Sequence, residues 1–361
     1  MLLLLSGCAL LSGVAPVNLK NVDVVEVRAT LVDGSGACPG NGVPLVLVAV
    51  AADGTEYSTQ PTGEQKPVRP QNFDVQGNGV RYDPSSGLLV VPADPGALWN
   101  AQGLATVTTA YHPQVQATVK VPVRYNCSYT ANFSGDSGRE GASGSMGSSG
   151  DHGVDKQSSE SYAEPGGHGQ DGGHGGDGVD GEPGRPGDEV VVQADLIEHP
   201  DGPLILVVVE SRSTNQSSRY VVAPGSTVTV TADGGSGGRG GNGGNGGSGG
   251  SGGTGAPPGN GGDGGDGGHG GNGADGADGG TVTVVLDPEV AKLGDPIEVV
   301  NRGGAGGQPG SAGAGGTGGN SFSGAEAGES GSMGQAGSRA GRDGRPGPKV
   351  QVSEKALNLK L

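Results

Sequence analysis

The chain has 361 residues, 80 of them glycine, with aromatic residues at only 3 % and a formal net charge of −17 at pH 7. A balance this acidic argues against nucleic acid and anionic lipid head groups as partners, because both would repel the chain. It favours a soluble, self-repelling protein, which suits a cell surface.

The N-terminus reads MLLLLSGCAL and matches the bacterial lipobox at Leu5, Ser6, Gly7 and Cys8. In this motif the leader is removed before the cysteine, which then carries the lipid. We expect a signal peptide at 1–7, an acylated Cys8 and a tether over 8–20; a chance Leu-rich start is the alternative. The residue after the cysteine is Ala9 and not aspartate, which in lipoproteins favours sorting to the outer membrane. No later segment has the ~18–20 apolar residues of a membrane span, so an anchored protein is expected.

Residues 21 to 133 are rich in β-branched residues and lack helical periodicity. Five stretches have the composition of strands, with Gly, Pro, Asp and Asn between them: 22–33, 42–51, 87–94, 103–113 and 115–126. A segment of about 110 residues with strands at short spacing is typical of an immunoglobulin-like β-sandwich. We predict such an all-β sandwich here.

Cys38 and Cys127 lie near the two ends of this segment. An exported protein is permitted disulfides, and closing a loop of this length contributes about 4–5 kcal/mol in the chain-entropy model. We expect the two cysteines to be paired; two free thiols are the alternative. No Cys or His cluster has metal-ligand spacing, so no metal or other cofactor is expected.

Residues 134 to 354 repeat one unit three times: strand, glycine arm, turn, glycine arm, strand. The hairpins span 135–187, 234–280 and 303–347, and a tail follows at 355–361. The arms are numbered in chain order: arm 1 (135–153), arm 2 (166–187), arm 3 (234–254), arm 4 (261–279), arm 5 (303–319) and arm 6 (328–347). Short strand-like segments such as 226–233 and 281–287 connect them, and we expect these to form a β-layer at the base.

Within each arm glycine recurs at every third residue, which fits neither a helix nor a strand. It fits the polyproline-II helix, whose rise of ~3.1 Å per residue gives arms ~60 Å long. Two ordered architectures use such rods: the three-chain collagen helix, and a polyglycine-II bundle in which arms of one chain bond side by side. Collagen needs roughly 15–20 % proline or more, which these arms lack. We therefore predict a six-arm bundle with essentially no α-helix; a collagen trimer and disordered low-complexity sequence are the alternatives.

The arm sequences, such as GGSGGRGGNGGNGG (234–247) and GGDGGDGGHGGNG (261–273), resemble those of polyglycine-II bundle proteins. That group includes springtail glycine-rich antifreeze proteins and the tip adhesins of certain phage tail fibres. The resemblance covers residues 135 to 347, is one of architecture, and implies no catalytic or binding residue. This chain departs from the antifreeze pattern in its longer arms and its charged outward positions.

The glycine content also predicts the order of the arms. A Gly-Gly-x rod offers two bare edges to its neighbours, whereas a Gly-x-x rod offers one. Arms 3 and 4 are richest in Gly-Gly-x and should be central, while arms 1 and 6 carry bulkier residues and should lie outside. A β-carbon at Gly244 should therefore destabilise the bundle far more than a larger side chain at Ser148.

The outward positions of arms 2 and 4 carry the candidate site. In arm 2 they are His168, Asp171, His174, Asp177 and Asp180, and in arm 4 Asp263, Asp266, His269, Asn272, Asp275 and Asp278. Successive members lie ~9 Å apart, so a cation site requires stripes of neighbouring arms to converge. We expect solvated stripes. The alternative is a weak divalent-cation or glycan surface, with ligands drawn from His168, Asp171, His174, Asp177, Asp263, Asp266 and His269.

No pattern indicates an enzyme. Windows such as 234–238 match the Gly-x-Ser-x-Gly nucleophile elbow but do not lie between a strand and a helix. We expect a monomeric structural or adhesive lipoprotein of the cell surface, anchored in the outer membrane. The alternative is a ligand-binding module that uses a flat face of the bundle for a glycan, a cell-surface protein or ice. Charged outward residues argue against ice.

Overall fold

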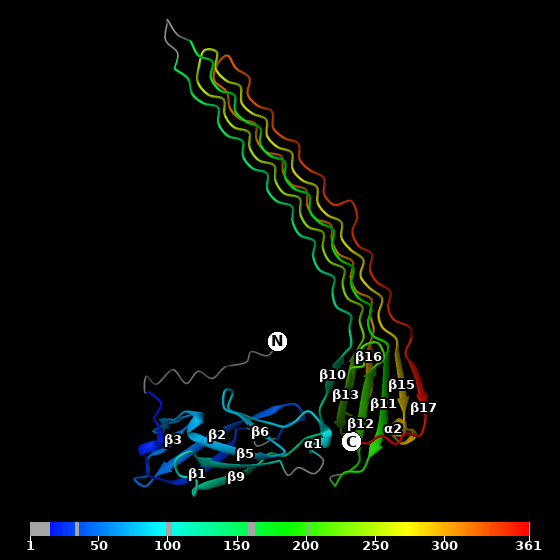
Figure 1. Ribbon diagram of the computed structural model, residues 1–361. Coiled ribbons are helices and arrows are strands. Elements are labelled where there is room, and N and C mark those ends of the chain that lie inside the picture. Colours follow the sequence, from blue (N-terminus) through cyan, green and yellow to red (C-terminus); the bar gives the residue numbers. More distant parts are fainter. Residues whose placement is uncertain (1–14, 33–35, 99–102, 158–162, 201, 361) are drawn as a thin grey trace.

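The computed structural model describes residues 15–32, 36–98, 103–157, 163–200 and 202–360. Figure 1 shows an N-terminal β-rich part, a second β-rich part that bears the labels β10, β11 and β17, and long arms that leave this second part together. The described residues are nearly all β: the longest helix is α2 (Pro288–Leu293). The prediction of an all-β chain with essentially no helix is confirmed at this level.

Two sheets form the N-terminal part. Its strands are β1 (Val24–Leu31), β2 (Gly42–Ala51), β3 (Glu56–Ser58), β4 (Lys66–Pro67), β5 (Phe73–Asn78), β6 (Arg81–Asp83), β7 (Leu88–Val90), β8 (Leu104–Thr109) and β9 (Gln116–Lys120). One sheet has the order β4-β3-β2-β7-β6, with β1 also paired to β2, and the other has the order β5-β8-β9. Alternate residues of β2 are buried, so Leu45 and Leu47 enter one core with Leu89 of the same sheet and Val107 of the other.

Two further sheets form the base of the arms. The strands are β10 (Tyr129–Asn132), β11 (Val190–Ile197), β12 (Leu204–Ser211), β13 (Ser217–Val222), β14 (Val228–Thr231), β15 (Val282–Leu286), β16 (Ile297–Val300) and β17 (Gln351–Glu354). Strands β10, β14 and β16 form a parallel sheet, and the other has the order β13-β12-β11-β15-β17. Their valines share one core, including Val190, Val207, Val230 and Val284.

This topology sorts the arms into two layers. Arms 1, 3 and 5 follow β10, β14 and β16, whereas arms 2, 4 and 6 lead into β11, β15 and β17. The two sets therefore run in opposite directions along the bundle, as Figure 1 shows. We call arms 1, 3 and 5 layer A, and arms 2, 4 and 6 layer B.

Backbone hydrogen bonds join the arms once per triplet. In arm 3, Gly243 donates to the carbonyl of Ser311 in arm 5 at 2.9 Å, and Gly244 donates to Gly176 in arm 2 at 2.8 Å. The carbonyl of Gly244 accepts from Gly268 in arm 4 at 2.8 Å, and Asn242 accepts from Gly144 in arm 1 at 2.7 Å. The N–H and C=O groups of a rod without internal hydrogen bonds are thus paired with neighbouring rods.

The same bonds fix the order of the arms. Arm 3 bonds to arms 1, 2, 4 and 5, and arm 4 bonds to arms 2, 3, 5 and 6. Arm 1 bonds to arms 2 and 3, and arm 6 to arms 4 and 5. The prediction that arms 3 and 4 are central and arms 1 and 6 peripheral is confirmed. Bare glycine edges occur where a neighbouring arm lies against the rod.

Close approach explains why those edges must be glycine. A β-carbon built on Gly244 lies 1.9 Å from the carbonyl oxygen of Ser145, and one on Gly268 lies 2.0 Å from the oxygen of Gly176. Both obstacles are backbone atoms, which cannot move aside without separating two arms. In arm 6 the spacing between Gly337 and Gly341 is four residues instead of three. Both glycines nevertheless donate to arm 5, Gly337 to Gly310 and Gly341 to Gly307, so the pairing continues across the extra residue.

Two local features of the base were not expected from the sequence. Helix α2 begins after Asp287, whose side chain accepts the N–H of Glu289; such N-capping satisfies an otherwise unpaired donor. The C-terminal tail lies against β11 and β12, where Leu359 donates its N–H to Asp195 at 2.7 Å and packs near Leu206.

Candidate functional site

The side chains of arm 2 point toward the backbone of arm 4. Each of the five outward residues predicted for arm 2 accepts, through its δ oxygen or nitrogen, an N–H from arm 4 or from Asn260, which directly precedes that arm. The pairs are His168 with Asn260 (3.0 Å), Asp171 with Asp263 (2.8 Å), His174 with Asp266 (3.0 Å), Asp177 with His269 (2.7 Å) and Asp180 with Asn272 (2.6 Å). The two stripes therefore lie side by side.

Arm 4 repeats this contact with arm 6. Its acceptors and their donors are Asp263 with Glu329 (2.8 Å), Asp266 with Ser332 (2.7 Å), His269 with Gln335 (2.9 Å), Asn272 with Arg339 (3.0 Å), Asp275 with Arg342 (2.9 Å) and Asp278 with Arg345 (2.7 Å). The outward residues of arm 4 thus accept a backbone N–H from arm 6 through their side chains. Asp263, Asp266, His269 and Asn272 also donate their own backbone N–H to a side chain of arm 2.

Layer A contains the same arrangement. Between arms 1 and 3, His152 accepts from Ser251 at 2.9 Å and Asp155 accepts from Thr254 at 2.7 Å. Between arms 3 and 5, Asn245 accepts from Ala314 at 2.9 Å, and Asn242 accepts from Ser311 at 2.9 Å. We call the complete set of these side-chain-to-backbone bonds, in both layers, the acceptor ladder.

Side-chain length explains which residues form the ladder. Oδ1 of Asp and Asn and Nδ1 of His all lie two bonds beyond the β-carbon, so the three residue types present an acceptor at the same reach. Glu and Gln would place it one bond further out. A histidine that accepts through Nδ1 carries its proton on Nε2. The outward N–H is the donor of a triplet that the bonds between backbones leave unpaired, and the ladder satisfies it along much of arms 4 and 6 and at Ser251, Thr254, Ser311 and Ala314.

The stripes are therefore structural as well as solvated. Solvated side chains were expected, and the side chains of His174 and Asp266 are indeed 75 % and 52 % exposed. Their acceptor role was not expected. The weak cation candidates His168, Asp171, His174, Asp177, Asp263, Asp266 and His269 direct an acceptor at a neighbouring N–H. Among the described residues, no group of three or more His, Cys, Asp or Glu has an arrangement that could hold a metal ion.

Hydrogen bonding lowers the pKa of three ladder carboxyls. For Asp266 the main cause is the hydroxyl of Ser332, and for Asp278 it is the backbone N–H of Arg345. For Asp155 the backbone N–H of Thr254 holds the pKa below its ordinary value. A donor that points at a carboxylate favours the ionised form, so these groups remain acceptors to lower pH than a free carboxyl.

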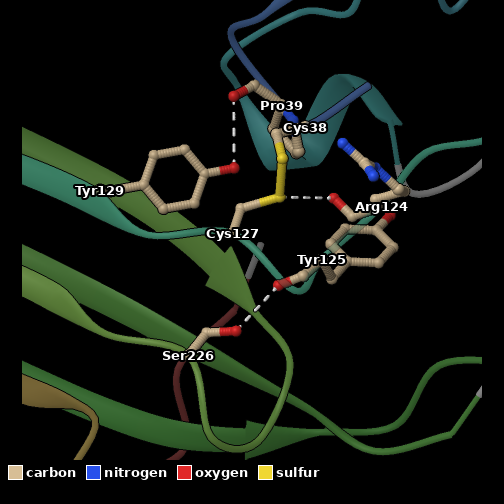
Figure 2. Close-up of a disulfide and its surroundings, with 7 residues drawn as sticks. All are labelled: Cys38, Pro39, Arg124, Tyr125, Cys127, Tyr129 and Ser226. Carbon is tan, nitrogen blue, oxygen red and sulfur yellow. Dashed lines mark hydrogen bonds between the residues drawn. A yellow bond between two sulfur atoms is a disulfide. The ribbon is translucent and has the colours of Figure 1, made fainter. Parts of the chain in front are cut away.

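The cysteines have different outcomes. Cys8 and the lipobox residues Leu5, Ser6 and Gly7 lie outside the described residues. In the structure Cys38 and Cys127, which are 89 positions apart in the sequence, form a disulfide. Figure 2 shows the bond beside Tyr129, whose hydroxyl donates to the carbonyl of Pro39 at 3.3 Å. The disulfide thus ties the N-terminal part to the strand that begins the first hairpin.

A cavity of about 480 Å³ lies next to this disulfide. One wall comes from the N-terminal part, with Asn41 and Asp94, and the other from the base, with Tyr129, Arg219 and Tyr220. The two tyrosine rings lie 5.0 Å apart between centroids, at an angle of 32°. The sequence alone gives no signal for this cavity, because its walls come from separate segments, around Asn41, Asp94, Tyr129 and Tyr220, that no motif connects.

Comparison with known proteins gives no relative: no family profile, curated protein or solved structure matches this chain. Across the described part of the chain, no helix has the length and apolar character needed to cross a membrane.

Proposed function

We propose that the chain is a non-enzymatic surface lipoprotein that acts as a structural or adhesive element, with its six arms forming a polyglycine-II bundle. The observation that carries this proposal is the triplet-by-triplet bonding of the arms. A bundle held by backbone bonds along its whole length is a stiff spacer that needs no hydrophobic core. In this proposal the N-terminal part is an immunoglobulin-like sandwich, the lipid on Cys8 anchors it in the outer membrane, and the bundle projects outward.

Deletion of the gene tests the adhesive role most directly, through attachment of cells to abiotic and cell surfaces. Loss of attachment that returns with the wild-type gene is expected. Protease treatment of intact cells gives a second test, because a displayed bundle is accessible and a periplasmic one is not. A protein that is protected in intact cells but cleaved after lysis would contradict surface display.

Lipid attachment has its own test. Metabolic labelling with a palmitate analogue is expected to mark the wild type and not the Cys8→Ala variant. Equal labelling of the two proteins would exclude acylation at Cys8.

The oligomeric state tests the bundle against collagen. Arms that bond within one chain predict a monomer in sedimentation experiments. A stable trimer with a collagen-type melting transition would contradict the bundle and favour the triple helix.

The difference between the two layers favours a second candidate function, ligand binding on a flat face. The outward residues of arms 3 and 5 in layer A are small and nearly uncharged: Ser236, Arg239, Asn242, Asn245, Ser248, Ser251, Thr254, Ala305, Gln308, Ser311, Ala314, Thr317 and Asn320. Those of layer B are mostly charged. Within layer A, arm 1 carries charged residues such as Asp136, Arg139 and Glu140, so the part of this layer formed by arms 3 and 5 has the chemistry that suits a glycan, an uncharged protein surface or ice. An ice recrystallisation assay with the full chain tests the last of these, and normal crystal growth would exclude it.

A further inference from the structure

We propose that the cavity between the N-terminal part and the base binds a neutral sugar ring, as the terminal residue of a glycan. This site is separate from the flat faces of the bundle, and the inference does not depend on the proposed adhesive role. It is carried by the chemistry of the walls and by the covalent bond beside them.

The aromatic wall suits the apolar face of a sugar. Tyr129 and Tyr220 are both half-buried, and their rings lie tilted against each other with centroids 5.0 Å apart. Burial raises the pKa of Tyr129 to about 12, so its ring remains neutral. An amphipathic ring offers a flat apolar surface with a polar edge, which matches a pyranose that has C–H groups on its faces and hydroxyls around its rim.

The charged residues of the lining, one on each wall, suit hydroxyls rather than a charge. Asp94 accepts the N–H of Gly96 at 3.0 Å through Oδ1, which orients the carboxylate at the cavity lining. Arg219 donates to the carbonyl of Lys360 at 3.3 Å through one nitrogen and belongs to the same lining. One carboxylate and one guanidinium supply acceptors and donors without net charge, so a neutral, hydroxyl-rich ligand fits better than an anion or a cation. The volume lies in the ~300–1,000 Å³ range of small-molecule sites.

The disulfide holds the two walls in place. Cys38 directly precedes Pro39 on one wall, and Cys127 lies two residues before Tyr129 on the other. Figure 2 shows the bridge together with the Tyr129 hydroxyl and the Pro39 carbonyl that it keeps close. A site assembled from two parts of a chain needs such a connection to be preformed, and preformed sites lose less entropy on binding.

The test is an array of neutral mono- and oligosaccharides probed with the labelled full chain, followed by titration of the strongest ligand. Asp94→Ala and Arg219→Ala are the main variants because both side chains are exposed, and Tyr220→Ala is added where its melting curve matches the wild type. We expect each to weaken binding by about tenfold or more. Tyr111→Ala, an exposed tyrosine outside the cavity, is the control and should bind normally.

Three outcomes would overturn the proposal. One is the absence of any neutral glycan ligand for the wild type. Another is a ligand whose affinity is unchanged by all the cavity variants, which would place binding on the bundle. A peptide that binds instead, by adding to the edge strand β13, would also contradict the assignment to a sugar.

Discussion

At the scale of single residues, the acceptor ladder gives the third position of each triplet a defined role. The position is exposed, so its side chain does not pack, yet where it accepts the N–H of the next arm its type is restricted by the reach that this bond needs. Asp, Asn and His occupy most of these positions on arms 2 and 4, whereas on arms 1 and 3 they are interspersed with Ser, Thr, Glu, Arg and Met. On arms 5 and 6, where each layer ends, Ala, Gln, Thr, Glu and Arg take their place.

Asn245 offers a clean test of this role because it carries no charge. It accepts the N–H of Ala314 at 2.9 Å. We expect Asn245→Ala to lower the free energy of unfolding by about 1 kcal/mol, the value of a typical hydrogen bond, measured by thermal or denaturant melting. Asn245→Asp keeps the acceptor at the same reach and should remain close to the wild type. An Asn245→Ala variant as stable as Asn245→Asp would show that the bond contributes nothing.

Acid should weaken the ladder. The pKa values of Asp155, Asp266 and Asp278 are lowered in the folded state, so the unfolded chain binds protons more readily than the folded one. Their contribution is therefore complete above the ordinary aspartate pKa of 3.8 and is lost as the pH falls through the lower folded values. Melting temperatures are expected to fall below about pH 4.

The matched control for this prediction is Asp278→Asn, which retains the acceptor but does not titrate. Its melting temperature should fall less steeply with acid than that of the wild type. Identical acid profiles for the two proteins would mean that Asp278 has the same pKa in the folded and unfolded states.

At the scale of the arms, the number of glycines in a triplet records the number of neighbours. Arms 3 and 4 each bond to four others and are nearly all Gly-Gly-x, whereas arms 1 and 6 each bond to two. Residues such as Asp136 and Arg139 in arm 1 stand where no further arm follows. The bundle therefore ends laterally where the second glycine of the triplet is replaced.

Gly244→Val and Ser148→Val compare the two environments. A β-carbon at Gly244 would lie 1.9 Å from the backbone oxygen of Ser145. Arms 1 and 3 would have to move apart to relieve this clash. We expect a loss of about 3 kcal/mol or more for Gly244→Val, among the larger effects of point mutations. Ser148 is exposed on an outer arm, so Ser148→Val should change stability by no more than about 0.5 kcal/mol. Equal melting temperatures for the two variants would contradict the central placement of arm 3.

Much of the architecture could be predicted from the sequence, for physical reasons that differ between elements. The strands that flank the arms, such as β14 and β15, contain alternating valine and threonine and lie next to glycine, so they can be predicted from the sequence. Short strands such as β3 and β4 have two or three residues and no alternation, so they were missed. The ladder depends on which arms are neighbours within a layer, and the cavity on how two parts of the chain meet. Neither of these long-range contacts can be predicted from the spacing of residues within one segment.

At the scale of the whole molecule, a disulfide cross-links the N-terminal part to the chain that enters the base. The disulfide between Cys38 and Cys127 closes a loop across 89 positions. Its removal should lower the free energy of unfolding by about 2–5 kcal/mol. Melting of the full chain with and without reductant measures this effect, and a Cys38→Ser, Cys127→Ser double variant should match the reduced wild type. A melting temperature that does not respond to reductant would contradict a stabilising role for the bond.

The regular spacing of the cross-arm bonds also constrains how such a chain can change in evolution. A triplet deleted from arm 3 alone would move every later partner in arms 1, 2, 4 and 5 out of register, so the length of one arm is tied to the lengths of all. Duplication of a complete hairpin has no such penalty, because it adds one arm to each layer at an edge. Descendants of this molecule should therefore differ in width by whole hairpins far more readily than in length by single triplets.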